Sequence, residues 1–151
     1  MAPKKKPETL EVLIKYHDKD LGKIEKIPVG DWIDLRCAER ADMEAGQFRI
    51  LSLGVSMKLP EGYEAHVVAR SSTFRRWGII QTNGIGIIDE SYCGEDDIWK
   101  FPALAMRNTT IFKGDRICQF RIVKKMPEIQ FTEVERMTDK NRGGLGSTGK
   151  D

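Results

Sequence analysis

The sequence predicts a small all-β domain. Short apolar runs are separated by turn residues at close spacing, apolar and polar side chains alternate within those runs, and helical periodicity is weak throughout. The chain has 151 residues, 40% of them hydrophobic, which suits a single domain with one compact core. We assign residues 1–137 to this β domain and residues 138–151 to a flexible, glycine-rich C-terminal segment.

Strands are expected at several places in the first half of the chain. Residues 10–16 and 48–53 alternate between apolar and polar side chains, as strands with one buried face do. Residues 55–59 carry apolar side chains at every second position, and this strand stops at the turn Pro60-Glu61-Gly62. The stretch from Trp32 to Ala45 is compatible with a helical turn, and no long helix is predicted.

The middle of the chain predicts a strand followed by a hairpin. In residues 64–71, His66 and Arg70 share one strand face, and small apolar side chains occupy the other. Residues 78–89 contain two apolar runs around Asn83-Gly84. Both central positions of a type I′ turn need positive φ, so this dipeptide predicts a type I′ hairpin.

A last strand and a compositionally distinct tail follow. After the turn at residues 113–115, Cys118 and Phe120 face one side of a strand and Ile117 and Gln119 the other. From residue 140 to the end there are four glycines and a single large apolar side chain. Such a segment buries too little surface to offset its ordering entropy, so we expect it to be mobile without ligand.

Charge and apolar patterning argue against several classes of function. The net charge is +2 and basic residues are scattered, whereas DNA-binding domains usually carry a basic stripe. No apolar run approaches the roughly 20 residues of a membrane helix, and no apolar segment follows the N-terminal lysines as in a secretory signal. We therefore expect a cytoplasmic protein that binds neither membranes nor nucleic acid.

Three cysteines and two histidines offer no zinc site. Cys37, Cys93 and Cys118 lack CxxC spacing, and neither histidine lies near a candidate motif. Residues 144–150 resemble the start of a P-loop, but no Ser or Thr follows Lys150, and no buried strand precedes the segment. Reduced thiols are expected, and the P-loop interpretation is rejected.

Two short segments carry groups suited to chemistry on a small anionic ligand. Asp89 and Tyr92 follow the glycine-rich hairpin, where a carboxylate can accept a proton from water and a ring can pack on a sugar. Arg70-Ser71-Ser72 ends a strand with one forked cation and two hydroxyls, although such a triplet can equally cap a turn. Each segment is ambiguous alone.

Taken together and in order, five segments resemble the five motifs of the trimeric dUTPase family. They are Gly30–Leu35, Arg70–Ser72, Gly86–Gly94, Gly114–Phe120 and Arg142–Gly149. The resemblance implies a jelly-roll-like distorted β-barrel, a homotrimer with shared active sites, and Mg²⁺-assisted hydrolysis of dUTP to dUMP and pyrophosphate. Such an enzyme limits uracil incorporation into DNA and supplies dUMP.

The resemblance also implies a role for each site residue. Asp89 would activate the water that attacks the α-phosphorus, and Asp34 would help hold, through water, a Mg²⁺ bound mainly by the triphosphate. Tyr92 would pack against deoxyribose and exclude a 2′-hydroxyl. The remaining substrate-binding residues are Asn83, Gly86 and Ile88 for uracil, Arg70, Ser71, Ser72 and Gln119 for phosphates, and Arg142, Leu145, Gly146, Ser147 and Thr148 from the tail.

Two departures from the family pattern lie in the tail. Leu145 stands where relatives usually have an aromatic residue that stacks on uracil, and the spacing between Arg142 and Gly144 is short. Trp99 or Phe101 is then a candidate to cover the base.

Three alternative functions stay open. A dCTP deaminase or bifunctional deaminase–dUTPase shares the fold and an Arg-Ser-Ser segment, but Tyr92 and the Gly-Ser-Thr-Gly tail favour a dUTPase. A nucleotide-responsive binding protein without turnover would gain nothing from Asp89. A β-rich nucleic-acid binder is disfavoured, because aromatic residues make up only 8% of the chain.

Overall fold

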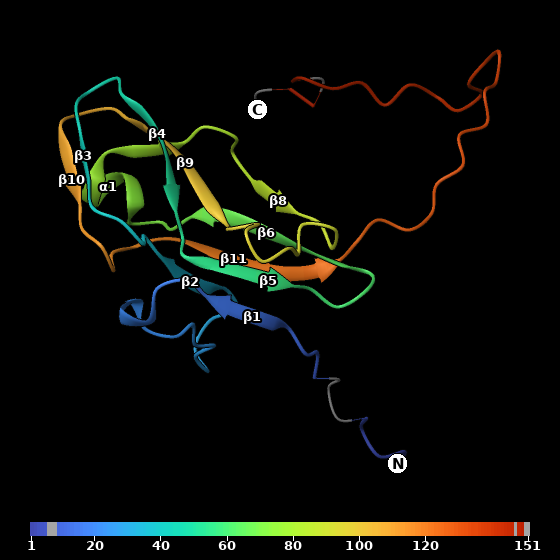
Figure 1. Cartoon of the computed structure of the whole chain (residues 1–151). Helices are drawn as coiled ribbons and strands as arrows, with labels where there is room; N and C mark the ends of the chain where they lie inside the picture. The colour runs from blue at the N-terminus through green and yellow to red at the C-terminus, as the bar shows by residue number, and fades with distance from the viewer. Residues whose placement is uncertain (6–8, 147, 150–151) are drawn as a thin grey trace.

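The computed structural model describes residues 1–5, 9–146 and 148–149, and its strands confirm the all-β prediction. Figure 1 shows the helices η1 (Lys19–Leu21) and α1 (Thr73–Trp77) beside them. The strands are β1 (Leu13–Tyr16), β2 (Ile33–Arg36), β3 (Ala41–Met43), β4 (Phe48–Ser52), β5 (Val55–Lys58), β6 (Tyr63–Ala69), β7 (Ile79–Gln81), β8 (Gly86–Ile88), β9 (Lys100–Ala105), β10 (Thr109–Ile111) and β11 (Arg116–Lys124).

Two larger antiparallel sheets enclose the core. One has the strand order β2-β11-β6-β8 and the other β4-β9-β7, while β1 pairs with β5 and β3 with β10. Buried side chains from both larger sheets belong to one hydrophobic cluster, among them Leu35 and Val67 from the first and Leu51 and Phe101 from the second. The predicted inward face of residues 55–59 is confirmed, because its apolar side chains are all buried.

Trp99 and Phe101 are both completely buried in this core. The Trp99 ring packs edge-on against Phe120, with ring centroids 5.2 Å apart. The hypothesis that either ring covers a bound base is therefore wrong.

The region between Trp32 and Ala45 forms strands β2 and β3 in place of the helical turn considered from the sequence. Ile33 and Leu35 alternate with polar residues here, which is a strand period that the charged residues around it obscured. The one α-helix among the described residues is α1, a single short turn that follows β6.

Strand β11 departs from simple alternation at its start. Ile117 and Cys118 are consecutive and both are completely buried. The register against β2 shifts between Arg116 and Cys118, as in a β-bulge, so two successive side chains turn inward. The prediction that Ile117 and Cys118 occupy opposite faces is wrong for this reason.

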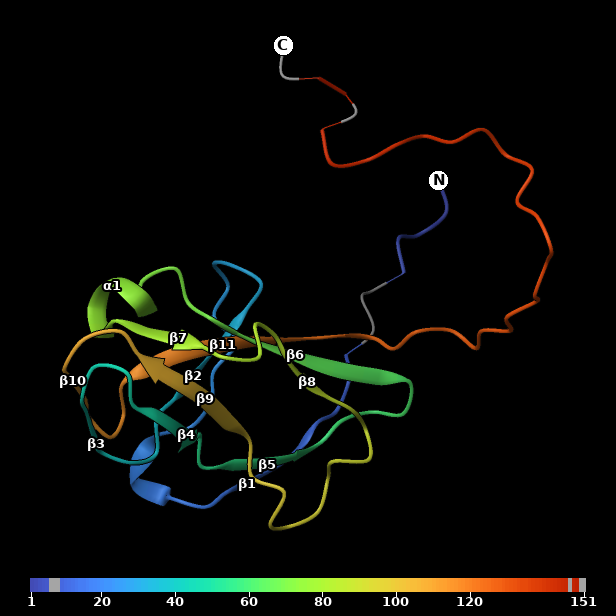
Figure 2. The same ribbon diagram turned by 90° about the horizontal axis from the view of Figure 1, so that it is seen from above.

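The chain leaves the folded body after β11. The Lys125 amide donates to the Gly62 carbonyl at 2.9 Å, and every described residue beyond it is exposed. Figures 1 and 2 show this segment projecting away from the body in both views. Its large exposed apolar side chains are Met126, Ile129, Phe131, Val134, Met137 and Leu145.

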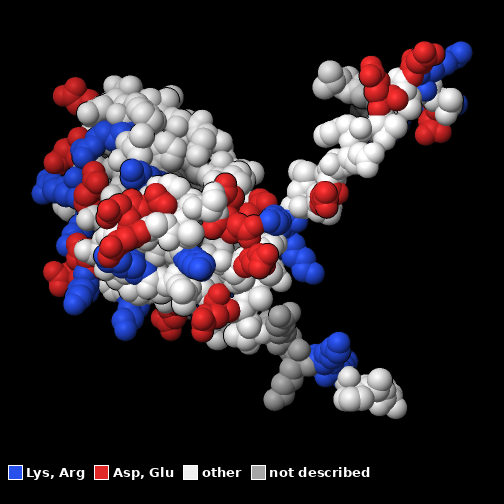
Figure 3. Space-filling model, turned by 45° about the vertical axis from the view of Figure 1, so that its right-hand side comes forward, with Lys and Arg blue, Asp and Glu red and all other residues white. Residues whose placement is uncertain are grey.

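The surface is mixed in charge, and acidic and basic side chains are interspersed over the face in Figure 3. Among the described residues, none of the helices has the length and apolar character needed to cross a membrane.

Candidate functional site

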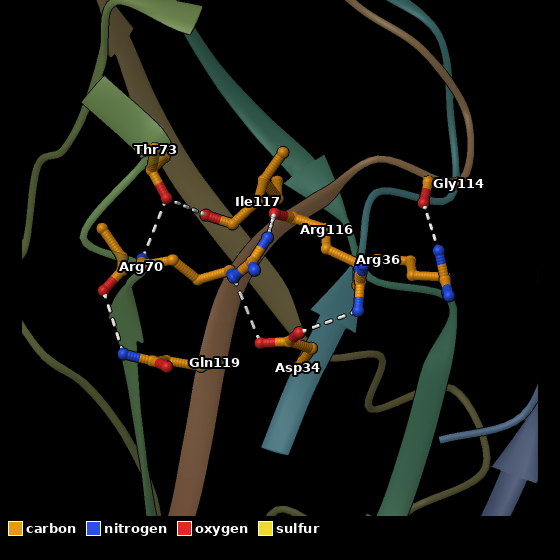
Figure 4. A network of polar contacts seen from close by, with 9 residues as sticks. Asp34, Arg36, Arg70, Thr73, Gly114, Arg116, Ile117 and Gln119 are labelled. Carbon is orange, nitrogen blue, oxygen red and sulfur yellow. Dashed lines mark hydrogen bonds and ion pairs between the residues drawn. The ribbon is translucent and has the colours of Figure 1, made fainter. Parts of the chain in front are cut away.

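A cluster of charged side chains lies where β2, β6 and β11 run side by side (Figure 4). The Asp34 carboxylate pairs with Arg70, with Oδ1 3.2 Å from Nε, and with Arg116, with Oδ2 3.3 Å from Nη1. The register explains this proximity, because Asp34 lies opposite Gln119 on β11. Asp34 thus holds two guanidinium groups next to each other.

Backbone carbonyls fix the arginine side chains in place. Arg70 Nη1 donates to the Arg116 carbonyl at 2.9 Å, and Arg36 Nη1 donates to the Gly114 carbonyl at 2.8 Å. The buried Thr73 hydroxyl accepts from the Arg70 amide and donates to the Ile117 carbonyl. These bonds tie the end of β6 to β11, so the arginines are held in position before any ligand arrives.

Ser71 and Ser72 connect β6 to α1. Ser72 is the N-cap residue of α1, yet its side chain makes no capping hydrogen bond. The Ser71 side chain lines a cavity of about 440 Å³, together with Asp34, Arg70, Arg116 and Gln119. Residues 21–25, 27 and 29–32 also line this cavity, Glu25 and Asp31 among them. Guanidinium and hydroxyl donors around one hollow suit a phosphate-bearing ligand.

Residues 79–88 form a second group, and its geometry differs from the expected hairpin. β7 pairs with β9 and β8 pairs with β6, and the described strands show no pairing between β7 and β8 (Figure 2). Gly84 has φ +69°, but Leu145 is the only described non-glycine residue with positive φ. Asn83 therefore cannot occupy a type I′ position, and that prediction is wrong.

This divergence leaves a loop whose two arms belong to different sheets. The Gly84 amide donates to the Gln81 carbonyl at 3.3 Å, and the Ile85 amide donates to the Asn83 carbonyl at 2.7 Å. Among the described strands, the two arms do not pair with each other, so the peptide groups on their facing edges are not used in strand pairing. β8 is thus an edge strand, and one side of Gly86–Ile88 has no strand partner among the described residues.

Asp89 follows β8 directly and is exposed. The Ser91 hydroxyl and the Ser91 amide both donate to Asp89 Oδ1, the amide at 2.7 Å. These hydrogen bonds hold the pKa of Asp89 below its ordinary value, with the hydroxyl contributing most. The carboxylate is ionised at neutral pH, as an ordinary Asp is, and the lowered pKa makes it a weaker base.

Tyr92 is half-buried three residues further on and packs against the core. Its hydroxyl donates to the Ile98 carbonyl at 3.0 Å, which fixes the ring. Glu90 anchors the same loop by accepting from the Gly62 amide at 2.7 Å and by pairing with Lys125.

Within one chain, the structure assembles only part of the expected site. Asp34, Arg70, Ser71 and Gln119 surround the cavity, but no residue of the 79–92 loop lines it. Of the tail residues, Arg142, Leu145, Gly146 and Thr148 are exposed without contact to either group, and Ser147 lies outside the described residues. Over the part of the chain that the structure describes, no cluster of His, Cys, Asp or Glu could hold a metal alone.

Sequence reasoning missed Arg116, Arg36 and Thr73 as members of the cluster. Arg116 lies inside a recognised segment, Gly114–Phe120, so its cationic side chain was available as a signal. Thr73 offered none, because its role depends on a turn that brings it beneath β11.

Comparisons with known proteins agree with one another. The dUTPase family model matches residues 33–149. A prophage-derived deoxyuridine 5′-triphosphate nucleotidohydrolase of Bacillus subtilis is 56% identical over 140 residues, covering 93% of this chain and 99% of its own. The deoxyuridine 5′-triphosphate nucleotidohydrolase of Neorickettsia sennetsu is 33% identical, covering 94% and 97%.

Among solved structures, a dUTPase of Staphylococcus bacteriophage 80alpha with dUpNHpp aligns with a TM-score of 0.76 at 21% identity. It covers 93% of this chain and 99% of its own. This likeness confirms the fold expected from the sequence.

Proposed function

The chain belongs to the dUTPase family and is a dUTP diphosphatase, and from this premise we propose how it acts. A water molecule activated by Asp89 attacks the α-phosphorus of dUTP, and dUMP and pyrophosphate leave. The observation that carries this proposal is the exposed Asp89 carboxylate, oriented by hydrogen bonds from Ser91 at the end of an open loop. In the cell, this reaction would limit uracil incorporation into DNA and supply dUMP.

Uracil is held by main-chain groups of the open loop. Asn83, Gly86 and Ile88 lie on arms that do not pair with one another, so their peptide groups can read the edge of a pyrimidine. The deoxyribose packs on Tyr92, whose ring is fixed by its bond to the Ile98 carbonyl. A rigid ring excludes a 2′-hydroxyl by overlap.

The triphosphate occupies the arginine-lined cavity. Arg70, Ser71 and Gln119 supply donors from the cavity wall, Arg116 adds a second guanidinium beside Arg70, and Ser72 follows Ser71 in the chain without lining the cavity. These groups stabilise negative charge that builds up during attack, and most of the acceleration comes from this and from positioning, because a carboxylate alone is a weak base.

A hydrated Mg²⁺ fits this site only with substrate present. Asp34 lines the cavity together with Glu25 and Asp31, and both Asp34 oxygens already face guanidinium groups. The chain therefore offers Asp34 as a partner for metal-bound water, while phosphate oxygens supply the direct ligands. The ion would neutralise triphosphate charge, and the residues named above would position the substrate around it.

A homotrimer completes the site. The cavity and the 79–92 loop are separate within one chain, so a neighbour must bring the second group to the first. The sheet β4-β9-β7 supports this proposal, because Phe48, Ile50 and Ile80 stand exposed on its outer face. Monomeric proteins rarely leave contiguous apolar faces open, and closed symmetry satisfies every copy equally.

The trimer should depend on that face. Changing Phe48 and Ile50 together to glutamate should convert the protein to monomers at micromolar concentration, because charges cannot be buried unpaired at an interface. Light scattering would show a mass near three chains for the unaltered protein and near one for the variant. Phe112→Glu is the matched control, since Phe112 is equally exposed but lies in the turn after β10. A monomeric, fully active native protein would contradict the proposal.

Tyr92 should set the preference for deoxyribose. Tyr92→Ala should lower the ratio of kcat/KM for dUTP over UTP by roughly 10-fold or more, because the overlap that excludes the 2′-hydroxyl is lost. Tyr92→Phe removes only the bond to the Ile98 carbonyl and should keep most of the preference. An unchanged ratio in the alanine variant would show that the sugar is read elsewhere.

Product analysis separates this function from its closest rival. The protein is incubated with dUTP, dCTP, dTTP and UTP, with and without Mg²⁺. Pyrophosphate release from dUTP alone supports the proposal. Ammonia release from dCTP would identify a deaminase, and binding without any product would identify a nucleotide sensor.

A further inference from the structure

Gln81 is a buried polar side chain that the proposed mechanism does not use. It is the last residue of β7, and only 7% of it is exposed. Its Nε2 donates to the Val67 carbonyl at 2.9 Å, while its Oε1 is buried without a partner. A buried, unpaired amide oxygen costs free energy that an apolar side chain would avoid.

The Val67 bond crosses from one sheet to the other beneath the open loop. Gln81 belongs to the β4-β9-β7 sheet, whereas Val67 lies on β6 and pairs with Gly86 of β8. Over the described residues, this is the one side-chain hydrogen bond that links β7 to the β6–β8 pair. It therefore connects one arm of the loop to the strand that carries the other arm.

The amide also lies against the backbone of the second arm. A Cβ at Gly86 would come within 3.3 Å of Val67 Cβ and 3.5 Å of Gln81 Nε2. The Gln81 amide therefore borders the space left by the missing side chain of Gly86. The Gln81 amide thus lies beside Gly86, whose peptide group is proposed to bind uracil.

We propose that Gln81 is a positioning residue that sets the width of the cleft between the β7 and β8 arms and thereby the enzyme's selectivity for uracil. This inference rests on the proposed use of the loop for base binding. Since β7 and β8 share no ladder, the hydrogen bond to Val67 takes the place of strand pairing. Gln81 itself does not touch the substrate.

Gln81→Leu tests the proposal, because leucine fills similar volume but cannot donate to Val67. The variant should raise KM for dUTP by about 10-fold with kcat changed by less than about 3-fold, as expected when binding geometry is lost and chemistry is not. The ratio of kcat/KM for dUTP over dCTP should decrease. The ratio for dUTP over UTP should stay the same, because Tyr92 reads the sugar.

Ile79→Val is the matched control, since Ile79 is buried on the same strand but makes no bond to Val67. Ile79→Val should leave KM for dUTP and both kcat/KM ratios unchanged. If Gln81→Leu does not fold, Gln81→Met replaces it.

The possible outcomes distinguish failure of the proposed function from failure of the role proposed for Gln81. Unaltered protein that releases no pyrophosphate from dUTP would overturn the proposed function. Active native enzyme combined with an unchanged KM in the variant, or with equal shifts in the base and sugar ratios, would overturn the role of Gln81 alone.

Discussion

Asp89→Asn should reduce kcat by roughly 10²–10⁴-fold, the usual contribution of a general base. Asparagine keeps an oxygen at the position that accepts from the Ser91 amide, so the loop should hold its conformation. Affinity for a non-hydrolysable dUTP analogue should stay within about 3-fold, because the carboxylate acts on water and not on the ground-state substrate. Steady-state kinetics and calorimetric titration measure the two effects separately.

Asp97→Asn provides a matched control for this substitution. Asp97 lies in the same loop and its Oδ2 accepts from the Gly94 amide at 2.8 Å, so the change in charge and geometry is equivalent. Its turnover should stay close to that of the native enzyme. Near-normal turnover in Asp89→Asn as well would remove Asp89 from the mechanism.

We propose that the tail closes over the bound nucleotide, so deletion of residues 140–151 should lower kcat/KM on the order of 10²-fold while the proposed trimer persists. Arg142 is exposed, and two glycines, Gly143 and Gly144, follow it. Ordering the tail costs about 1–2 kcal/mol of backbone entropy per residue, so only charge-assisted contacts to phosphate can offset it.

Hydrogen exchange gives a second measurement on the full-length protein. The amides of residues 138–146 should exchange freely without ligand and become protected when a dUTP analogue and Mg²⁺ are both bound. Arg142→Ala serves as the point variant and should lose part of this protection. A truncated enzyme with full activity would show that the tail is not a lid.

The strand pattern was predictable from the sequence where one face of a strand is buried. Residues 55–59 and 64–71 alternate cleanly, and the structure places their apolar sides in the core. The helical turn near Trp32 was a wrong expectation because charged neighbours hide the alternation of Ile33 and Leu35. Ile117 turned inward through a register shift, which no pattern in the side chains announces.

The segments that contribute site residues could be predicted from the sequence, but the arrangement of those residues in space could not. Asn83-Gly84 is a strong hairpin signal, yet tertiary pairing with β9 and β6 separates its arms, and a local signal carries no information about distant partners. Arg116 joins Asp34 and Arg70 only because β2 and β11 run side by side. Such contacts depend on sheet order.

The separation of β7 and β8 affects which substitutions in the loop between them are compatible with binding of the base. If main-chain peptide groups bind the base, as proposed, a substitution changes a side chain but keeps the amide and carbonyl in place, unless it introduces proline. Ile85 and Ile87, with exposures of 49% and 58%, can be exchanged without erasing the hydrogen-bonding pattern that a base meets. Gly86 is more constrained, because a Cβ there would lie 3.3 Å from Val67 Cβ, so Val67 would have to shift. If peptide groups bind uracil as proposed, most substitutions of exposed loop side chains leave base recognition intact, and the sensitive positions are Gly86 and the buried Gln81.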